Sequence, residues 1–205
     1  MTDKKTKRAT TKGRNTMRNI IAVVMLAGII LLSGCANTPN VPNEVRVTAP
    51  DITDFQKPVL QPVRLSVRDQ RTQNHVLRVE HTPDNAEFAT THIPMATLMS
   101  AALREYWPHD DNSQVLFTVY LEDALTRVVA QNDGYEAEHH VAVRVVVRSG
   151  TEWIGRQYVT RVSGGPYRKV NFEQINDTFN RAVHATLRDL MSDQILQEWL
   201  QDHVQ

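Results

Sequence analysis

Apolar and polar residues alternate most regularly between Ala137 and Arg148. The odd-numbered positions are mostly valine, and the even-numbered positions carry most of the charges. A period of two is typical of a half-buried β-strand. Ser149-Gly150 predicts a tight turn, after which residues 151–162 return as a second strand. A two-residue loop at that turn sets a register with apolar opposite apolar and acid opposite base, and the expected pairs are Val145 with Ile154, Val141 with Tyr158, and Glu138 with Arg161.

Alternation predicts three further strands, at residues 63–67, more weakly at 76–80, and at 115–129 with a bulge. Asn132-Asp133-Gly134 predicts the turn from residues 115–129 into the strand that starts at 137. Ser163-Gly164-Gly165-Pro166 is expected to end the sheet. A short edge strand at residues 45–47 is also compatible with the pattern.

Two segments have helical periodicity instead. Residues 93–106 place one apolar stripe on a helix face, with Pro94 in the first turn and Trp107-Pro108 at the end. Asn171 and Gln174 have the spacing of a capping box that opens a long second helix. Its apolar phase slips near Ser192-Asp193, which predicts a kink or a second short helix. The expected stripe of the first helix is Met95, Leu98, Met99, Ala102, Leu103 and Tyr106.

The order of these elements predicts an α+β fold. We expect an antiparallel sheet of about four to five strands with two helices packed on one face and the other face wet. Residues 63–205 suit a single domain of this kind. Five prolines between residues 36 and 62 favour a stiff, solvated tether before it, so residues 35–62 are assigned to Cys35 and this tether.

The first 34 residues have the layout of a secretory signal. Seven basic residues and one acid precede thirteen uncharged, mostly branched residues, Ile20 to Leu32. That run is shorter than the about 20 residues needed to span a ~30 Å hydrocarbon core. Leu32-Ser33-Gly34-Cys35 follows, and it resembles the lipobox of bacterial lipoproteins. The resemblance implies cleavage between Gly34 and Cys35, an S-diacylglyceryl group on Cys35 and acylation of its new amino group. An ordinary signal peptide or an uncleaved N-terminal anchor is the alternative.

Removal of the signal changes the charge balance of the chain. The full sequence is neutral, but the signal takes seven of 23 basic and one of 23 acidic residues, so the mature chain keeps 16 basic and 22 acidic residues, a net charge of −6. This argues against a nucleic-acid partner and against polybasic contact with anionic headgroups. Cys35 is the only cysteine, so no disulfide is expected.

The mature chain resembles the YajG-type lipoproteins, a family of bacterial outer-membrane lipoproteins of uncharacterised function. Four features carry the resemblance: the lipobox, the strand that runs into Asp69-Gln70-Arg71-Thr72, the three-stranded meander 115–162, and the terminal helix from Asn171 to Leu200. It implies an α+β domain and passage to the periplasmic face of the outer membrane, which Ala36 rather than Asp after Cys35 also favours. The family implies no catalytic residues.

Asp69 and Arg71 form the most family-like pair, at a strand end. They could bind a ligand as a charge pair, or they could stabilise a turn in which Asp69 accepts backbone N–H groups. His139 and His140 are neighbours on a strand, so their rings point to opposite faces and cannot share one metal ion. No nucleophile motif or facing pair of acids is present in the mature chain, so we expect neither an enzyme nor a metal, and no cofactor beyond the covalent lipid on Cys35.

Three functions remain open from the sequence. The first is a non-catalytic binding or adaptor module of the cell envelope, which would be held by its lipid anchor and would contact an envelope protein or peptidoglycan. The second is a carrier of lipid or of a small apolar molecule, or a transport accessory, because strand 137–147 and helix 95–106 offer apolar faces. The third is a hydrolase that would use Asp69 or Glu138.

Overall fold

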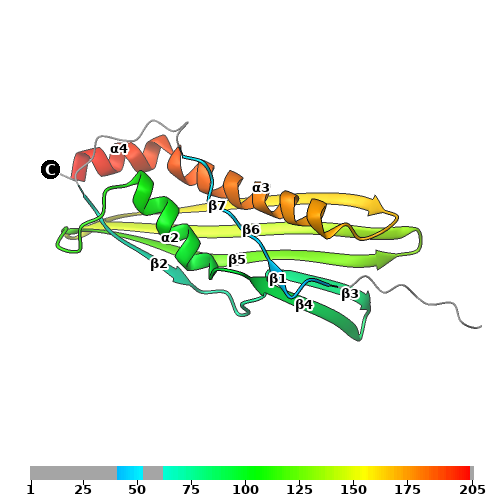
Figure 1. The fold of residues 1–205 in the computed structure, drawn as a ribbon. Coiled ribbons are helices and arrows are strands. Elements are labelled where there is room, and N and C mark those ends of the chain that lie inside the picture. The colour runs from blue at the N-terminus through cyan, green and yellow to red at the C-terminus, as the bar shows by residue number, and fades with distance from the viewer. Residues whose placement is uncertain (1–40, 53–61, 204–205) are drawn as a thin grey trace, which may run out of the picture. The chain divides into compact units, whose positions relative to one another are not determined.

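The computed structural model describes residues 41–52 and 62–203. The predicted signal peptide, its cleavage site and Cys35 lie outside the described residues. Among the described residues, no helix has both the length and the apolar character needed to cross a membrane. A seven-stranded sheet carries three helices (Figure 1). In chain order the elements are β1 (Glu44–Val45), β2 (Arg64–Asp69), β3 (Leu77–Thr82), β4 (Asn85–Thr91), α2 (Met95–Tyr106), β5 (Val115–Gln131), β6 (Gly134–Ser149), β7 (Glu152–Tyr167), α3 (Phe172–Met191) and α4 (Gln194–His203).

The α+β class is confirmed, but the sheet is mixed, so the prediction of an antiparallel sheet of four to five strands is wrong. Strands β5, β6 and β7 form the predicted antiparallel meander. Strands β2 and β3 both run parallel to β5, and β1 runs parallel to β4. Parallel neighbours need a long crossover connection. Strand β4 and helix α2 form the connection from β3 to β5, and strands β2 and β3 lie in the connection from β1 to β4.

The predicted register of the β6–β7 hairpin is wrong by two residues. Val147 pairs with Ile154, Val143 with Tyr158, and His140 with Arg161. The loop consists of residues 150 and 151 rather than 149 and 150, because Gly150 takes the positive φ of +57° that the first central position of such a turn requires. A shift of two residues keeps every side chain on its predicted face.

Strand β7 does not end at Ser163 but continues to Tyr167. The glycines and the proline that predict a sheet break are instead accommodated by a register shift against residues 135–137 of β6. Gly165 has a φ of +123°, and a Cβ there would lie 2.8 Å from the carbonyl oxygen of Tyr135. This position therefore requires glycine.

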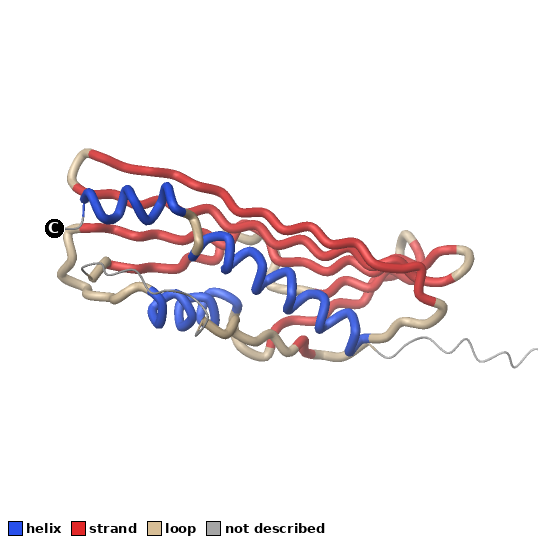
Figure 2. Tube along the Cα trace, turned by 90° about the horizontal axis from the view of Figure 1, so that it is seen from above, coloured by secondary structure: helices blue, strands red, loops and turns tan. Residues whose placement is uncertain are grey.

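The helices cover one face of the sheet, as predicted (Figure 2). The buried residues of α2 are the six of the expected stripe. Asn171 caps α3 by accepting a hydrogen bond from the backbone N–H of Gln174, and Ser192-Asp193 separates α3 from the third helix, α4. The Tyr106 hydroxyl donates to the carbonyl of Met191 over 2.9 Å, which ties the end of α2 to the end of α3.

Residues 41–52 pack against the domain, whereas the prolines predict a solvated tether. Val41, Val45 and Ile52 are buried in the core. The backbone N–H of Thr48 donates to Asn180 Oδ1 on α3 over 2.9 Å. The edge strand predicted at residues 45–47 is the two-residue β1, which lies one residue earlier.

Candidate functional site

One edge of β5 is paired in two separate stretches. Strand β2 pairs with residues 116–121 of β5, and β3 pairs with residues 126–129. The last backbone contact before the interruption is the hydrogen bond from the N–H of Gln70 to the carbonyl of Leu121. The first contact after it is the hydrogen bond from the N–H of Thr126 to the carbonyl of Val76. β5 has a bulge at this place, between Leu121 and Asp123. The connection 71–75 therefore projects from the middle of the sheet edge.

Asp69 and Arg71 pair with each other at the start of this connection. The guanidinium Nε of Arg71 donates to Asp69 Oδ1 over 2.9 Å and Nη2 donates to Oδ2 over 2.7 Å, while the backbone N–H of Arg71 also donates to Oδ1. The Arg71 side chain is only 6% exposed, and its Nη1 is buried without a hydrogen-bond partner among the described residues. The hydrogen bond from Arg71 lowers the pKa of Asp69. This bidentate pair fixes the turn and leaves one guanidinium nitrogen unsatisfied.

A cleft of about 780 Å³ lies over this turn. Its chemistry is mixed, with two guanidinium groups, one carboxylate, an imidazole and an exposed phenyl ring. Phe88 of β4 is 51% exposed, and its ring centroid lies 4.7 Å from that of His75. Arg78 Cζ lies 5.9 Å from the centroid of the Phe88 ring. The lining residues are Asp69, Arg71, Thr72, Gln73, Asn74, His75, Arg78 and Phe88.

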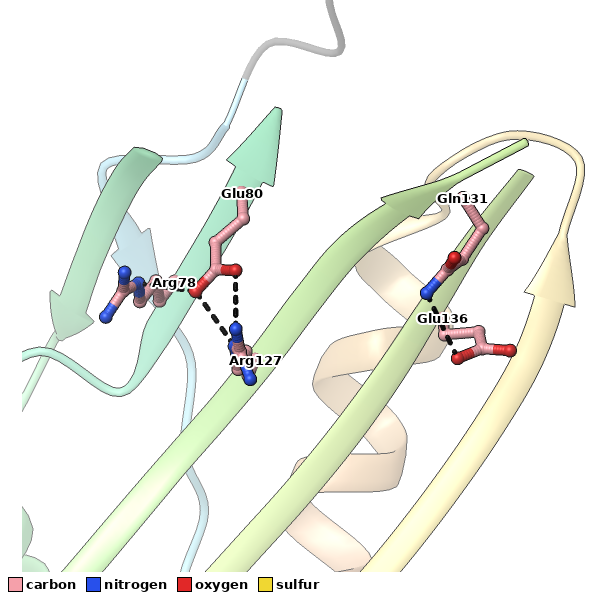
Figure 3. A network of polar contacts seen from close by, with 5 residues as sticks. All are labelled: Arg78, Glu80, Arg127, Gln131 and Glu136. Carbon is pink, nitrogen blue, oxygen red and sulfur yellow. Dashed lines mark hydrogen bonds and ion pairs between the residues drawn. The ribbon is translucent and has the colours of Figure 1, made fainter. Parts of the chain in front are cut away.

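Arg78 is held at this cleft by Glu80 (Figure 3). Arg78 Nε lies 2.8 Å from Glu80 Oε1, and Arg127 of β5 donates to both carboxylate oxygens over 2.8 and 2.7 Å. The hydrogen bond from Arg127 lowers the pKa of Glu80. Glu80 thus joins β3 to β5 and places Arg78 beside Phe88. Figure 3 also shows Gln131 donating to Glu136 at the far end of the β5–β6 hairpin.

The cleft carries a surplus of positive charge. Arg71 and Arg78 are opposed by Asp69 alone among the lining residues. Burial lowers the pKa of His75, and the charges of Arg78 and Arg71 lower it further, so the ring is neutral at pH 7. Guanidinium groups bind carboxylate or phosphate, and the neutral imidazole of His75, tilted by 57° against the phenyl ring of Phe88, offers an apolar contact. This chemistry suits binding of an anion that bears an apolar group.

The histidines of β6 lie on opposite faces, as their spacing predicts. His139 is fully buried and its Nδ1 lies 2.9 Å from Thr126 Oγ1, while His140 Nδ1 lies 2.6 Å from Asp123 Oδ2 on the other face. In the described part of the chain, no three His, Cys, Asp or Glu side chains gather closely enough to hold a metal ion. Glu122 accepts from Arg144 and Gln157. The structure does not place Glu138 among the residues that line the Asp69 cleft.

A smaller, more apolar cavity of about 240 Å³ lies under the start of α3. Its floor includes Thr126, and its wall includes Asn176, whose Oδ1 is buried without a partner in the described chain. The apolar residues around it come from the segment before β2, from β3 and from α3: Pro42, Val45, Val76, Leu77, Phe172, Ile175 and Phe179.

Sequence reasoning missed Phe88 and Arg78 as site residues. Phe88 lies on β4, where the alternation of Asn85-Ala86-Glu87-Phe88 breaks at Ala89, which is the buried residue of the strand. Pro83-Asp84, which forms the turn between β3 and β4, is the signal that could have found this hairpin.

Comparisons with known proteins identify a family and a solved structure of similar fold. A family model described as "Uncharacterized lipoprotein" matches residues 50–201. The crystal structure of a Xanthomonas campestris protein of the DUF330 family superposes with a TM-score of 0.58 at 9% identity, covering 78% of this chain and 98% of that one. A second crystal structure, of an uncharacterised protein, gives a TM-score of 0.41 at 11% identity and covers 73% of this chain and 97% of its own. No curated protein matches the sequence.

Proposed function

Since the chain belongs to the family of uncharacterised lipoproteins whose model spans residues 50–201, we propose that it is a membrane-anchored, non-catalytic binding module of the cell envelope. The family match confirms the resemblance to YajG-type lipoproteins. The anchoring residue in this proposal is Cys35, with residues 1–34 removed and the domain on the periplasmic face of the outer membrane. Two or three acyl chains on one residue suffice for firm anchoring.

Mass analysis of the protein extracted from its host membrane tests the anchor. The expected species begins at Cys35 and carries the mass of a diacylglyceryl group and an N-acyl chain. A Cys35→Ser variant should leave the membrane fraction. Recovery of residues 1–34 still attached, or of an unmodified Cys35, would contradict the proposal.

The observation that carries the binding role is the cleft at the interruption between β2 and β3. It combines a buried, unsatisfied Arg71 nitrogen with the exposed Phe88 and a surplus of positive charge. Its single carboxylate is already paired with Arg71, so the cleft is better suited to hold a ligand than to catalyse acid–base chemistry. Peptidoglycan fragments carry carboxylates on a peptide and fit this chemistry.

Calorimetric titration with a purified disaccharide–tetrapeptide from peptidoglycan tests this role. Arg78→Gln removes a charged hydrogen-bond donor and should weaken binding about tenfold, and Phe88→Ala should also weaken it. Ile195→Ala is the matched control for Phe88, because Ile195 is 54% exposed but lies on α4. Absence of binding to the wild-type protein, or equal binding by the Arg78 variant, would refute a wall-binding role for the cleft.

A carrier of lipid or of a small apolar molecule is the second candidate function, and the cavity under α3 supports it. The cavity is lined mainly by apolar side chains and has one unsatisfied acceptor, Asn176 Oδ1. Native mass spectrometry of the protein purified from envelopes should then show a copurified ligand that is lost in Ile175→Trp, which fills the cavity. A protein that carries no additional mass would count against this function.

A further inference from the structure

The sheet face that points away from the helices is strongly basic at one end. Directly paired residues of neighbouring strands share a face. One row across β2, β5, β6 and β7 is therefore Arg64, Leu116, Arg148 and Trp153, and a second row, four residues further along, is Arg68, Tyr120, Arg144 and Gln157. We call this surface the arginine face, defined by Arg64, Arg68, Arg144, Arg148 and Trp153.

The register fixes the spacing of the four arginines. Arg64 and Arg148 are separated by the width of one strand, β5, so their backbones lie about 10 Å apart. Arg64 and Arg68 are four residues apart on β2, which corresponds to about 13 Å. The four arginines therefore mark the corners of a rectangle on a sheet surface, and none of the cavities described above is lined by them.

Three of these arginines are available to an external ligand. Arg144 donates to Glu122 over 2.6 Å and its Cζ lies 4.2 Å from the ring centroid of Tyr120. By contrast, Arg64, Arg68 and Arg148 are exposed and have no ion pair or side-chain hydrogen bond with any residue that the structure describes. Three uncompensated positive charges thus lie within a small area of a mature chain whose net charge is −6.

The residues between and beside the arginines are apolar or weakly polar. By register Thr118 lies at the centre of the rectangle, Leu116 and Val146 lie on two of its sides, and Trp153 beside Arg148 is 64% exposed. Glu122 lies on this face beside Arg144, and further acids of the face, among them Glu80, Glu136 and Glu138, lie toward the other end of the strands. An exposed tryptophan beside arginines is typical of surfaces that contact the headgroup region of a membrane.

The packing of residues 41–52 keeps the domain near any lipid on Cys35. Because Val41 is already buried in the core, only the six residue steps from Cys35 to Val41 can separate lipid and domain. A fully extended chain of that length reaches about 20 Å. A domain on so short a connection meets the membrane surface repeatedly, so even a weak electrostatic contact can orient it.

We propose that the arginine face lies against a membrane surface that contains anionic phospholipid and so orients the domain on its anchor. This inference rests on the proposed membrane anchoring. It departs from the expectation drawn from the net charge, because the positive charge is concentrated on one face of the sheet. An exposed arginine near an anionic bilayer strengthens binding about fivefold. Loss of Arg64, Arg68 and Arg148 should therefore weaken binding about a hundredfold.

Cosedimentation with lipid vesicles tests the proposal without the anchor. The segment from Pro39 to Gln205 contains every core residue of the described chain and forms one compact unit, so it serves as the unlipidated protein. It should bind vesicles of phosphatidylcholine with 30% phosphatidylglycerol and release them as salt rises, and it should bind pure phosphatidylcholine far more weakly. The triple variant Arg64→Gln, Arg68→Gln, Arg148→Gln should lose binding to the anionic vesicles.

The matched control is Arg104→Gln, Arg168→Gln, Arg188→Gln, which removes the same charge from exposed positions away from this face and should keep most of the binding. Brominated lipids should quench the fluorescence of Trp153, and the quenching should vanish in Trp153→Phe. Equal binding to both vesicle types, equal losses in the two triple variants, or quenching that survives Trp153→Phe would overturn the proposal. These outcomes leave the anchor itself to the mass analysis of Cys35.

Discussion

Acidification should destabilise the protein through one buried imidazole, that of His139. The ring has no solvent exposure, its Nδ1 contacts Thr126 Oγ1, and its Nε2 is buried without a partner among the described residues. Burial lowers the pKa of His139 to about 4, and the charge of Arg181 contributes to the shift. The folded protein therefore holds the neutral ring, while in the unfolded chain the same ring titrates near its ordinary value of about 6.5.

The sign and size of the effect follow from proton linkage. Between pH 6.5 and pH 4 the unfolded chain binds one more proton at this site than the folded protein does. The free energy of unfolding therefore decreases as the pH is lowered. The stabilisation is complete above pH 6.5. The loss between pH 7 and pH 5 is about 2 kcal/mol, and near pH 4 it levels off at about 3 kcal/mol. These are upper values, because relaxation of the structure around the protonated ring reduces them.

Urea denaturation of the segment from Pro39 to Gln205 at pH 7 and pH 5 measures this loss. The double variant Thr126→Val, His139→Leu removes both partners of the buried hydrogen bond and should lose about 2 kcal/mol less than the wild type between the two pH values. His75, whose pKa burial also lowers, is present in both proteins and cancels. Identical losses in the wild type and the double variant would refute the assignment to His139.

Substitutions at three further positions test the packing and one turn. Asp193→Ala should lower the free energy of unfolding by about 2 kcal/mol, because Asp193 accepts from Tyr158 and Arg156 and caps α4. Asp193→Asn keeps a capping oxygen and should lose less, and equal losses in the two variants would contradict a contribution of the cap. Trp107→Ala should cost about 3–5 kcal/mol in the same urea assay, since Trp107 is fully buried beside α2, and a loss below 1 kcal/mol would contradict that packing. Gly150→Ala should cost about 1 kcal/mol, because alanine disfavours a φ of +57°, and this should lower the thermal midpoint. Gly150→Asn should lower the midpoint less. A lower midpoint for the Asn variant than for the Ala variant would be inconsistent with the turn.

The elements with strong periodicity could be predicted from the sequence. The valines of β6 repeat at every second position from Val141 to Val147, and their buried side was correctly identified. The buried stripe of α2 and the Asn171 cap of α3 were predicted residue by residue. In each case the signal is local, because one face of the element meets the core and the other meets solvent.

Strand pairing could not be predicted to the same degree, because it depends on residues distant in sequence. Alternation identifies β2 and β3 but is silent on which strand they join and in which direction. Both pair in parallel with β5 across the crossover that contains α2. The hairpin register was missed for a different reason, since Ser149-Gly150 and Gly150-Thr151 are both acceptable two-residue loops and differ only in where glycine takes its positive φ.

The candidate site could be predicted only in part. Asp69 and Arg71 attract attention as a charge pair at a strand end, and the structure shows that each is the other's partner. Their neighbours Arg78 and Phe88 come from β3 and β4, so the cleft exists only once the hairpin folds back beside the connection. The arginine face has the same character, because its members are dispersed between positions 64 and 153 and only the register brings them together.

A mismatch in strand length explains why the cleft forms where it does. Two residue pairs, Asp69–Leu121 and Leu77–Thr126, flank the interruption. Between them the edge chain, which runs from β2 to β3, takes eight residue steps, while β5 takes five. Along the same interval β6 takes only four, because β5 carries its bulge there. A bulge turns the side chains of a strand to the opposite face. Leu65 and Val79 can both point into the core only if the chain between them contains an odd number of residues more than the paired stretch of β5. The three surplus residues meet this condition, and they are accommodated because the chain leaves the ladder. The projecting turn that holds Arg71 is therefore a consequence of the bulge in β5, and the two features are expected to change together.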